Sequence, residues 1–195
     1  VADAGRHLLR NAGNAVHSLA TRDGYDAYTL AADVASGWLE SGDEHARHPL
    51  VWALVGQAET GLKIGELPAA LAATARIIEL ATDSAGMATV RIRARCLRGQ
   101  VLDSQGNPEE ALHVLRAAVD DARKRETGFG ASVFAVSLIA MVLLRTGRAT
   151  EAELIARRAL EECEDAEIGS DTDLNLGIGR LHTWLGHAHA RKGDH

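Results

Sequence analysis

The sequence predicts an all-α fold, a solenoid of antiparallel helix hairpins, from three observations. Glycines at candidate turns recur 41 residues apart, at Gly65, Gly106 and Gly147, and Gly24 lies one step earlier. Small residues keep the same step at Ala70, Ala111 and Ala152. The composition is 46% hydrophobic but only 4% aromatic, which favours close helix packing over sheet. A fixed period of this kind is typical of repeats that bury their apolar faces against their neighbours. We therefore expect one domain, residues 1–195.

Two hairpins are predicted in the first half of the chain. The first pairs a helix over about 5–22 with one over about 26–40, with its turn at Asp23-Gly24. The second runs from Pro49 to Ile64, turns at Gly65-Glu66 and returns from Pro68 to about Ala81. Proline suits the first turn of a helix because it has no N–H to satisfy there.

The third and fourth hairpins have clear boundaries. In the third, a helix ends at Gly106, Asn107 is a candidate N-cap, and the return helix ends near Lys124-Arg125. The fourth uses 130–146 and about 149–163, and Thr150 and Glu153 have the spacing of a capping box. The repeats thus fall at about 5–48, 49–89, 90–130 and 131–170.

A final helix is expected over 171–193, capped by Ser170 or Asp171 after an acidic linker that should lie in solvent. The chain stops where a return helix should follow, so we expect a fragment of a longer protein. Its open end should expose Leu181, Trp184 and Leu185, which gives a route to homo-oligomers.

Charge and cysteine content limit the functional classes. A net charge of −6 disfavours direct nucleic-acid binding, which needs a basic surface. Cys96 and Cys163 are expected to be buried free thiols, which favours a cytoplasmic location. The uncharged run 127–144 contains two glycines and two serines, so a buried helix is a better interpretation than a membrane span.

Several motifs resemble the tetratricopeptide repeat. They are Gly-x-x-Leu, Gln-Gly-Asn-Pro-Glu-Glu-Ala-Leu and Ala-Ala-Val within 99–119, and Trp-Leu-Gly at 184–186. The family's small positions on the first helix of each hairpin correspond to His17, Ala58, Gly99, Ala140 and Gly186, and those on the return helix include Ala118 and Ala159. The resemblance covers 49–193, and 5–48 loosely. It implies a right-handed superhelical solenoid.

The repeat of 41 residues is longer than the family's usual repeat of about 34. The longer step resembles the helical arms of maltose-regulator-like and LuxR-type bacterial transcription activators. That resemblance implies a non-catalytic protein-binding or sensing module of a regulatory protein. The alternatives are a self-assembling structural scaffold and an arm that binds a small-molecule inducer.

In the tetratricopeptide family the first helix of each hairpin lines a concave groove that holds a protein or peptide. The resemblance transfers three outward positions per repeat to this sequence. They are Asn11, Asn14 and Ser18; Trp52, Val55 and Glu59; Arg93, Cys96 and Gln100; Phe134, Ser137 and Met141; Arg180, Thr183 and His187. Aromatic and Met side chains would supply affinity and the polar ones would orient the ligand. The alternative is that Trp52, Phe134 and Met141 pack between hairpins.

Catalysis is not expected, and no cofactor or metal is implied. The histidines at 182, 187 and 189 are spaced by five and two residues, whereas a metal pair on one helix needs three or four. His45 and His48 have a better spacing but lack the Glu of a zinc-protease motif. Gly128-Phe129-Gly130 lacks the lysine of a phosphate loop.

Overall fold

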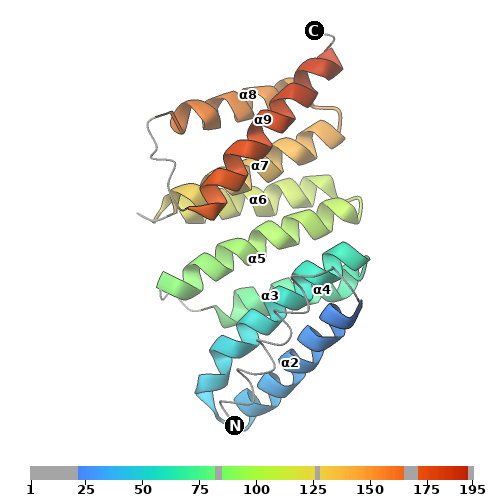
Figure 1. The fold of residues 1–195 in the computed structure, drawn as a ribbon, viewed down its shortest axis with the longest axis vertical. Coiled ribbons are helices and arrows are strands. Elements are labelled where there is room, and N and C mark those ends of the chain that lie inside the picture. Colours follow the sequence, from blue (N-terminus) through green and yellow to red (C-terminus); the bar gives the residue numbers. More distant parts are fainter. Residues whose placement is uncertain (1–21, 82–84, 126–127, 165–170, 193–195) are drawn as a thin grey trace. The chain divides into compact units, whose positions relative to one another are not determined.

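The computed structural model describes residues 22–81, 85–125, 128–164 and 171–192, and within them every regular element is a helix (Figure 1). The helices are α2 (Arg22–Glu40), the 3-10 turn η1 (Glu44–Ala46), α3 (Arg47–Ile64), α4 (Leu67–Leu80), α5 (Ala85–Ser104), α6 (Pro108–Arg123), α7 (Phe129–Arg145), α8 (Ala149–Glu162) and α9 (Thr172–Lys192). The all-α prediction is confirmed. The handedness of a solenoid and its tetratricopeptide-like arrangement stay predictions.

Contacts group the chain into two compact units, unit 1 (Val1–Val101) and unit 2 (Leu102–His195). In unit 1, α3 packs against both α2 and α4. Its core stripe includes Leu50, Leu54 and Ala58, spaced four residues apart on one face of α3. Ile77 of α4 and Ala94 of α5 complete this core. Full burial of an aliphatic side chain such as Leu50 stabilises the unit by about 2 kcal/mol.

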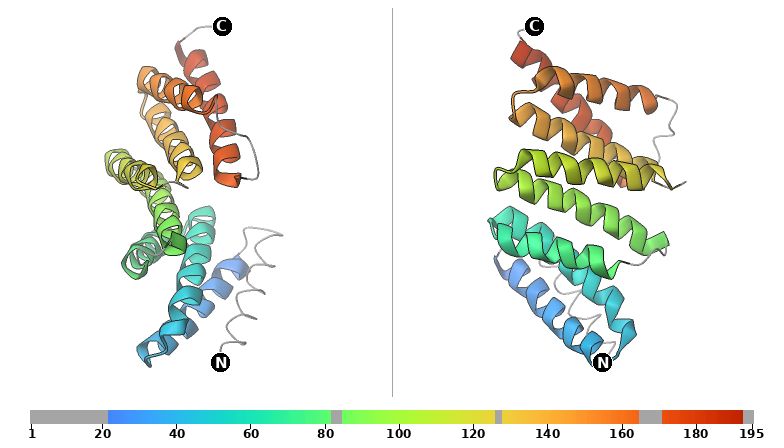
Figure 2. Two further views of the ribbon diagram at one scale, coloured as in Figure 1. Left: turned by 90° about the vertical axis from the view of Figure 1, so that its left-hand side faces the viewer. Right: turned by 180° about the vertical axis from the view of Figure 1, so that it is seen from behind.

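Unit 2 is built around α7, which packs against α6, α8 and α9. Within the unit, α9 crosses α7 on the side away from α6 (Figure 2). Twelve residues of α7 are buried, from Gly130 to Leu144. A helix that is apolar on all sides is expected at the centre of a core, so the interpretation of the uncharged run as a buried helix is confirmed. No described helix is long and apolar enough to cross a membrane.

One helix-ending motif occurs four times in the described residues. Gly42, Gly65, Gly106 and Gly147 have φ between 80° and 94°, in the left-handed region. The residue after each glycine donates its N–H to the carbonyl five residues earlier, at 2.8–3.0 Å, as in Asn107 to Leu102. This is the Schellman pattern, for which glycine is favoured because it carries no Cβ. The 41-residue step from Gly65 to Gly147 is therefore a step between helix ends.

The structure corrects three local predictions. Gly24 is not a turn glycine, because it is buried within α2, which begins at Arg22. The partner helix predicted at 5–22 lies almost wholly outside the described residues.

Asn107 occupies the N-cap position of α6, but its side chain makes no capping hydrogen bond. Thr150 lies inside α8, whose N-cap is Arg148, so the Thr150–Glu153 capping box is wrong. The expected cap at Asp171 is confirmed, since its Oδ1 accepts from Leu174 N at 3.0 Å.

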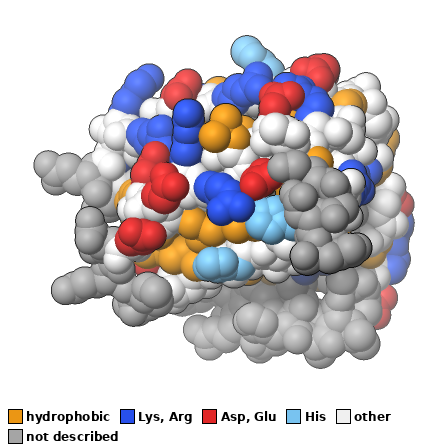
Figure 3. Space-filling model, turned by 90° about the horizontal axis from the view of Figure 1, so that it is seen from above, with side chains coloured by type: hydrophobic (Ala, Val, Ile, Leu, Met, Phe, Trp, Pro, Cys, Tyr) orange, Lys and Arg blue, Asp and Glu red, His pale blue; other side chains and the backbone are white. Residues whose placement is uncertain are grey.

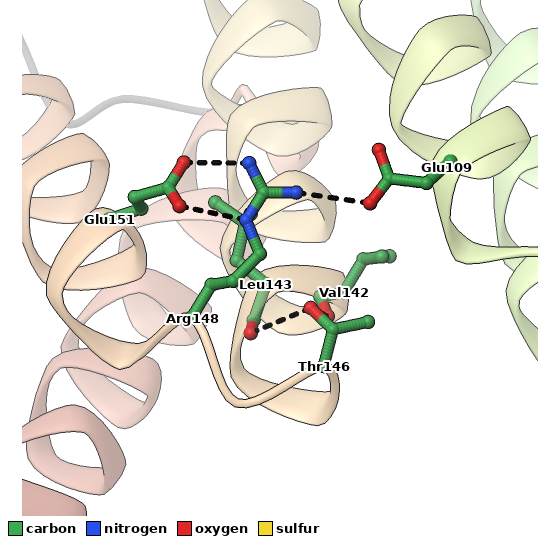
Figure 4. A network of polar contacts seen from close by, with 6 residues as sticks. All are labelled: Glu109, Val142, Leu143, Thr146, Arg148 and Glu151. Atoms are coloured by element: carbon green, nitrogen blue, oxygen red, sulfur yellow. Dashed lines mark hydrogen bonds and ion pairs between the residues drawn. The ribbon is translucent and has the colours of Figure 1, made fainter.

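Arg148 connects successive return helices at their N-terminal ends (Figure 4). Its guanidinium donates to Glu151 at 2.7 Å within α8 and to Glu109 of α6 at 3.2 Å. Both carboxylates lie in the first turn of their helices, where the dipole favours negative charge. The hydrogen bond from Arg148 lowers the pKa of Glu151. At the end of α7, the Thr146 hydroxyl donates to the carbonyls of Val142 and Leu143 at 3.0 Å.

The C-terminal helix is less exposed than the sequence suggests. Leu181 is fully buried, and Trp184 and Leu185 are only partly exposed, because α9 packs against α7 and α8. An extra Cβ at Gly177 would lie 2.9 Å from the backbone nitrogen of Phe134, so glycine permits this close crossing. Seen from above, the molecule shows hydrophobic side chains interspersed with basic, acidic and His side chains (Figure 3). Because Leu181 is fully buried, the prediction that it is exposed is wrong.

Candidate functional site

The predicted groove positions divide between the two units. Asn11, Asn14 and Ser18 lie outside the described residues. In unit 1, Trp52 and Arg93 are exposed, and Glu59 and Gln100 are partly exposed. Val55 and Cys96 are buried at 3% and 2% exposure and line no hollow that the structure shows in the described residues, so their assignment to the groove is wrong. Val55 belongs to the core of unit 1, and both α3 and α5 present only a narrow strip of their surface to solvent.

Trp52 retains 40% of its surface in solvent. Its indole Nε1 donates to His48 Nε2 at 3.2 Å, one helical turn earlier on α3. The two rings also lie in contact, with centroids 6.2 Å apart. The indole is thus held by its own helix rather than packed into the core. The alternative that Trp52 packs between hairpins does not describe this residue.

Glu59 and Arg93 join α3 to α5. Arg93 Nε donates to Glu59 Oε1 at 2.9 Å, with the side chains 52% and 26% exposed. Arg93, one of the predicted polar groove positions, therefore already has a carboxylate partner within the protein. Gln100 Nε2 donates a long hydrogen bond to the carbonyl of Cys96 at 3.4 Å. Trp52, Glu59 and Arg93 form what we call the α3–α5 face.

The unit 2 positions make a second, more buried set. The Arg180 guanidinium of α9 lies over the Phe134 ring of α7, 5.5 Å from its centroid, and burial lowers the pKa of Arg180. Met141 is half-buried. Ser137 is wholly buried and donates to the Phe134 carbonyl at 2.6 Å, so its assignment to the groove is wrong. Phe134 is engaged within the protein, as the packing alternative proposed.

The predicted polar positions near the end of α9 are accessible. Thr183 is exposed and donates to the carbonyl of Gly179 at 3.0 Å. His187 is exposed beside Trp184, with ring centroids 5.7 Å apart. His189 Nε2 lies 3.3 Å from Glu153 Oε1 and 2.9 Å from an Arg157 nitrogen. Among the described residues, no three His, Cys, Asp or Glu side chains gather in a metal-binding arrangement.

A hollow that the sequence reasoning did not predict lies on the other side of α7. Its volume is about 260 Å³, and it is bounded by α6, α7 and α8. The apolar part of its lining consists of Val119, Val136, Ile139, Ile155 and Ala159. The charged part consists of Arg116, Asp120, Arg123, Arg158 and Glu162. On a helical wheel, Val136 and Ile139 lie on the side of α7 opposite Phe134 and Met141.

The charges at this hollow are unequally satisfied. Arg123 and Glu162 form an ion pair at 2.9 Å across α6 and α8. Arg116 acts on Glu151 only through its charge, and helps to lower the pKa of that carboxyl. Within the described part of the chain, neither Arg158 nor Asp120 forms a hydrogen bond or ion pair with another side chain. Two arginines thus remain to meet one unpaired carboxylate, so the hollow has an excess of positive charge.

The hollow was not predicted because candidate ligand-binding positions were taken only from the first helix of each hairpin. The charged residues of the hollow belong to the return helices α6 and α8. A signal exists in the sequence. Arg116, Asp120 and Arg123 are spaced by four and three residues, and so are Ile155, Ala159 and Glu162. Such stripes also describe an ordinary solvated helix face, and only the packing of α6 and α8 around α7 makes them one site.

Cys96 and Cys163 are buried thiols outside any disulfide, as the sequence predicts. Burial raises the pKa of Cys163, with Glu162 adding to the effect, so the thiolate is disfavoured.

Comparisons with protein-family models, curated proteins and solved structures give no match for this chain.

Proposed function

We propose that this chain is a non-catalytic binding module that holds a protein or peptide segment on the α3–α5 face of unit 1. The observation that carries the proposal is the exposure of Trp52, a large aromatic side chain held in place by His48 but 40% accessible to solvent. Tryptophan and arginine are the residues most enriched among those that dominate protein interfaces.

The two parts of this face have different roles. The Trp52 ring offers apolar area for a side chain of the ligand. Arg93 uses its Nε and one terminal nitrogen on Glu59, which leaves other N–H donors of its guanidinium for ligand carbonyls. Because Glu59 already neutralises Arg93, a strongly acidic ligand has no advantage here. The face suits a neutral or weakly polar segment with one large apolar side chain.

A sensing role in a bacterial regulatory protein, which the repeat resemblance implies, is the wider form of the same proposal. In that form the bound segment would report the state of a partner protein to modules elsewhere in the regulator. The support for it is the 41-residue period of helix-ending glycines at Gly65, Gly106 and Gly147, with the repeat motifs around them.

The test is selection of peptides from a random displayed library on the wild-type chain, followed by affinity measurements on variants. Trp52→Ala should weaken the selected peptides at least about tenfold, as truncation of an interface anchor does. Leu30→Ala is the matched control, because Leu30 of α2 is an exposed apolar side chain of the same unit. Arg93→Glu should also weaken binding, because it places two carboxylates together.

Each variant is first checked for an unchanged urea-unfolding midpoint. Selected peptides that bind Trp52→Ala as tightly as wild type would show that the α3–α5 face is not the binding surface.

A further inference from the structure

We infer that the hollow between α6, α7 and α8 of unit 2 binds a small monocarboxylate with a short apolar body. This site is separate from the α3–α5 face and does not depend on the peptide proposal. The inference rests on three properties of the hollow: its size, the division of its lining into apolar and charged parts, and the excess of arginine at its edge.

The size of the hollow limits the ligand. At about 260 Å³ it is below the usual range of about 300–1,000 Å³ for sites that bind drug-sized molecules. A nucleotide or an oligosaccharide could not be enclosed by a hollow of this volume. Val136 and Ile139 retain 7% and 5% of their surface, so the partly exposed Ile155 supplies most of the apolar area that a short hydrocarbon or a single ring could cover.

The charged side chains at the hollow determine whether the polar end of the ligand is negative or positive. Arg123 is occupied by Glu162, whereas Arg158 has no side-chain partner in the described residues. Arginine binds a carboxylate through two parallel N–H···O hydrogen bonds, which a neutral amide cannot match in strength. Asp120 opposes an anion, so it should reduce the affinity rather than contribute to it.

An apolar ligand without charge would leave Arg158 unused, and a small anion without an apolar body would leave the exposed part of Ile155 uncovered. A monocarboxylate such as hexanoate satisfies both parts at once. Because the hollow is open to solvent and its ion pair is exposed, the expected affinity is modest, with a dissociation constant on the order of 1 mM.

The experiment is a titration of the full chain with hexanoate, followed by NMR of labelled Ile and Val methyl groups. The methyl signals of Ile139 and Ile155 should shift. Hexanamide, which has the same body without the charge, should bind at least about fivefold more weakly, and acetate should bind more weakly still. Added salt should weaken hexanoate binding, because the charged partner is exposed.

Two variants at the hollow should act in opposite directions. Arg158→Gln should weaken hexanoate about three- to tenfold, and Asp120→Asn should strengthen it about two- to threefold. Arg157→Gln is the matched control, because the neighbouring Arg157 is paired with Glu153 and does not line the hollow. It should leave the affinity unchanged.

Equal binding of hexanoate and hexanamide would overturn the proposal, as would equal affinities of wild type and Arg158→Gln. An absence of methyl shifts at Ile139 and Ile155 up to tens of millimolar would overturn it too. Because the two variants have opposite expected effects, a general loss of folding cannot imitate the predicted result.

Discussion

Replacing Gly106 by alanine adds one methyl group to a place with no neighbouring atom. A Cβ built there meets nothing within 4 Å, yet the backbone φ is 83°. The same change at Gly179 of α9 also meets nothing within 4 Å, but there the backbone is helical. The two substitutions therefore differ only in backbone conformation, because neither creates a clash.

The expected effects have opposite signs. An L-residue in the left-handed region costs about 1–2 kcal/mol, whereas alanine in a helix interior is better than glycine by about 0.5–1 kcal/mol. Alanine also restricts the unfolded chain, which offsets part of the first cost. We expect Gly106→Ala to lower the free energy of unfolding by about 1 kcal/mol and Gly179→Ala to raise it by about 0.5 kcal/mol.

The assay is urea unfolding followed by the fluorescence of Trp184, which lies in unit 2 with both glycines. Trp38 and Trp52 are replaced by phenylalanine in all samples so that they do not report unit 1. The slope of unfolding free energy against urea should stay constant while the midpoint moves. If Gly106→Ala is as stable as its parent, or if both variants shift the midpoint in the same direction, the left-handed helix end is refuted.

Two further predictions concern contacts inside unit 2. Gly177→Ala should destabilise unit 2 by about 1–3 kcal/mol, because the new Cβ would lie only 2.9 Å from the backbone of α7. Gly179→Ala on the same helix should not destabilise it, and the urea midpoints of the two variants test this difference. Arg145→Met should cost about 1–2 kcal/mol at pH 7, after discounting for the exposed guanidinium, because it leaves the buried Asp103 carboxylate without its 2.8 Å partner. Burial raises the pKa of Asp103, so ionisation of this carboxyl lowers the free energy of unfolding as the pH rises through that pKa. The destabilisation caused by Arg145→Met should therefore shrink at lower pH, where Asp103 is protonated. Equal destabilisation at all pH values would contradict this.

The sequence predicted helix positions well where a glycine or proline lies directly at the end or start of a helix. Gly65, Gly106 and Gly147 end helices in the structure, and the return helix expected from Pro68 begins at Leu67. It failed at Gly24, because a shared period does not reveal whether a glycine lies at a helix end or within a helix. Gly42 is the left-handed glycine of that region, outside the period.

Site prediction was limited by packing between helices. The position ten residues before each turn glycine was expected to face outward, yet Val55, Cys96 and Ser137, which occupy it, are all buried, whereas Trp52 on the same helix as Val55 is exposed. The partner of each side chain decides the difference. Nothing in the order of residues shows that Arg180 will cover Phe134, or that Arg123 will meet Glu162 across two hairpins.

The helix-ending motif at Gly106 contains all its parts within six residues: the accepting carbonyl of Leu102, the glycine itself and the donating N–H of Asn107. It needs no side chain from a neighbouring helix. A gene segment coding for one hairpin would therefore bring its own helix terminator to any place where it was copied. Duplication of such a segment would add a hairpin that ends its own helix without a matching change elsewhere, whereas a link such as Arg148–Glu109 between return helices needs a residue from each of two hairpins.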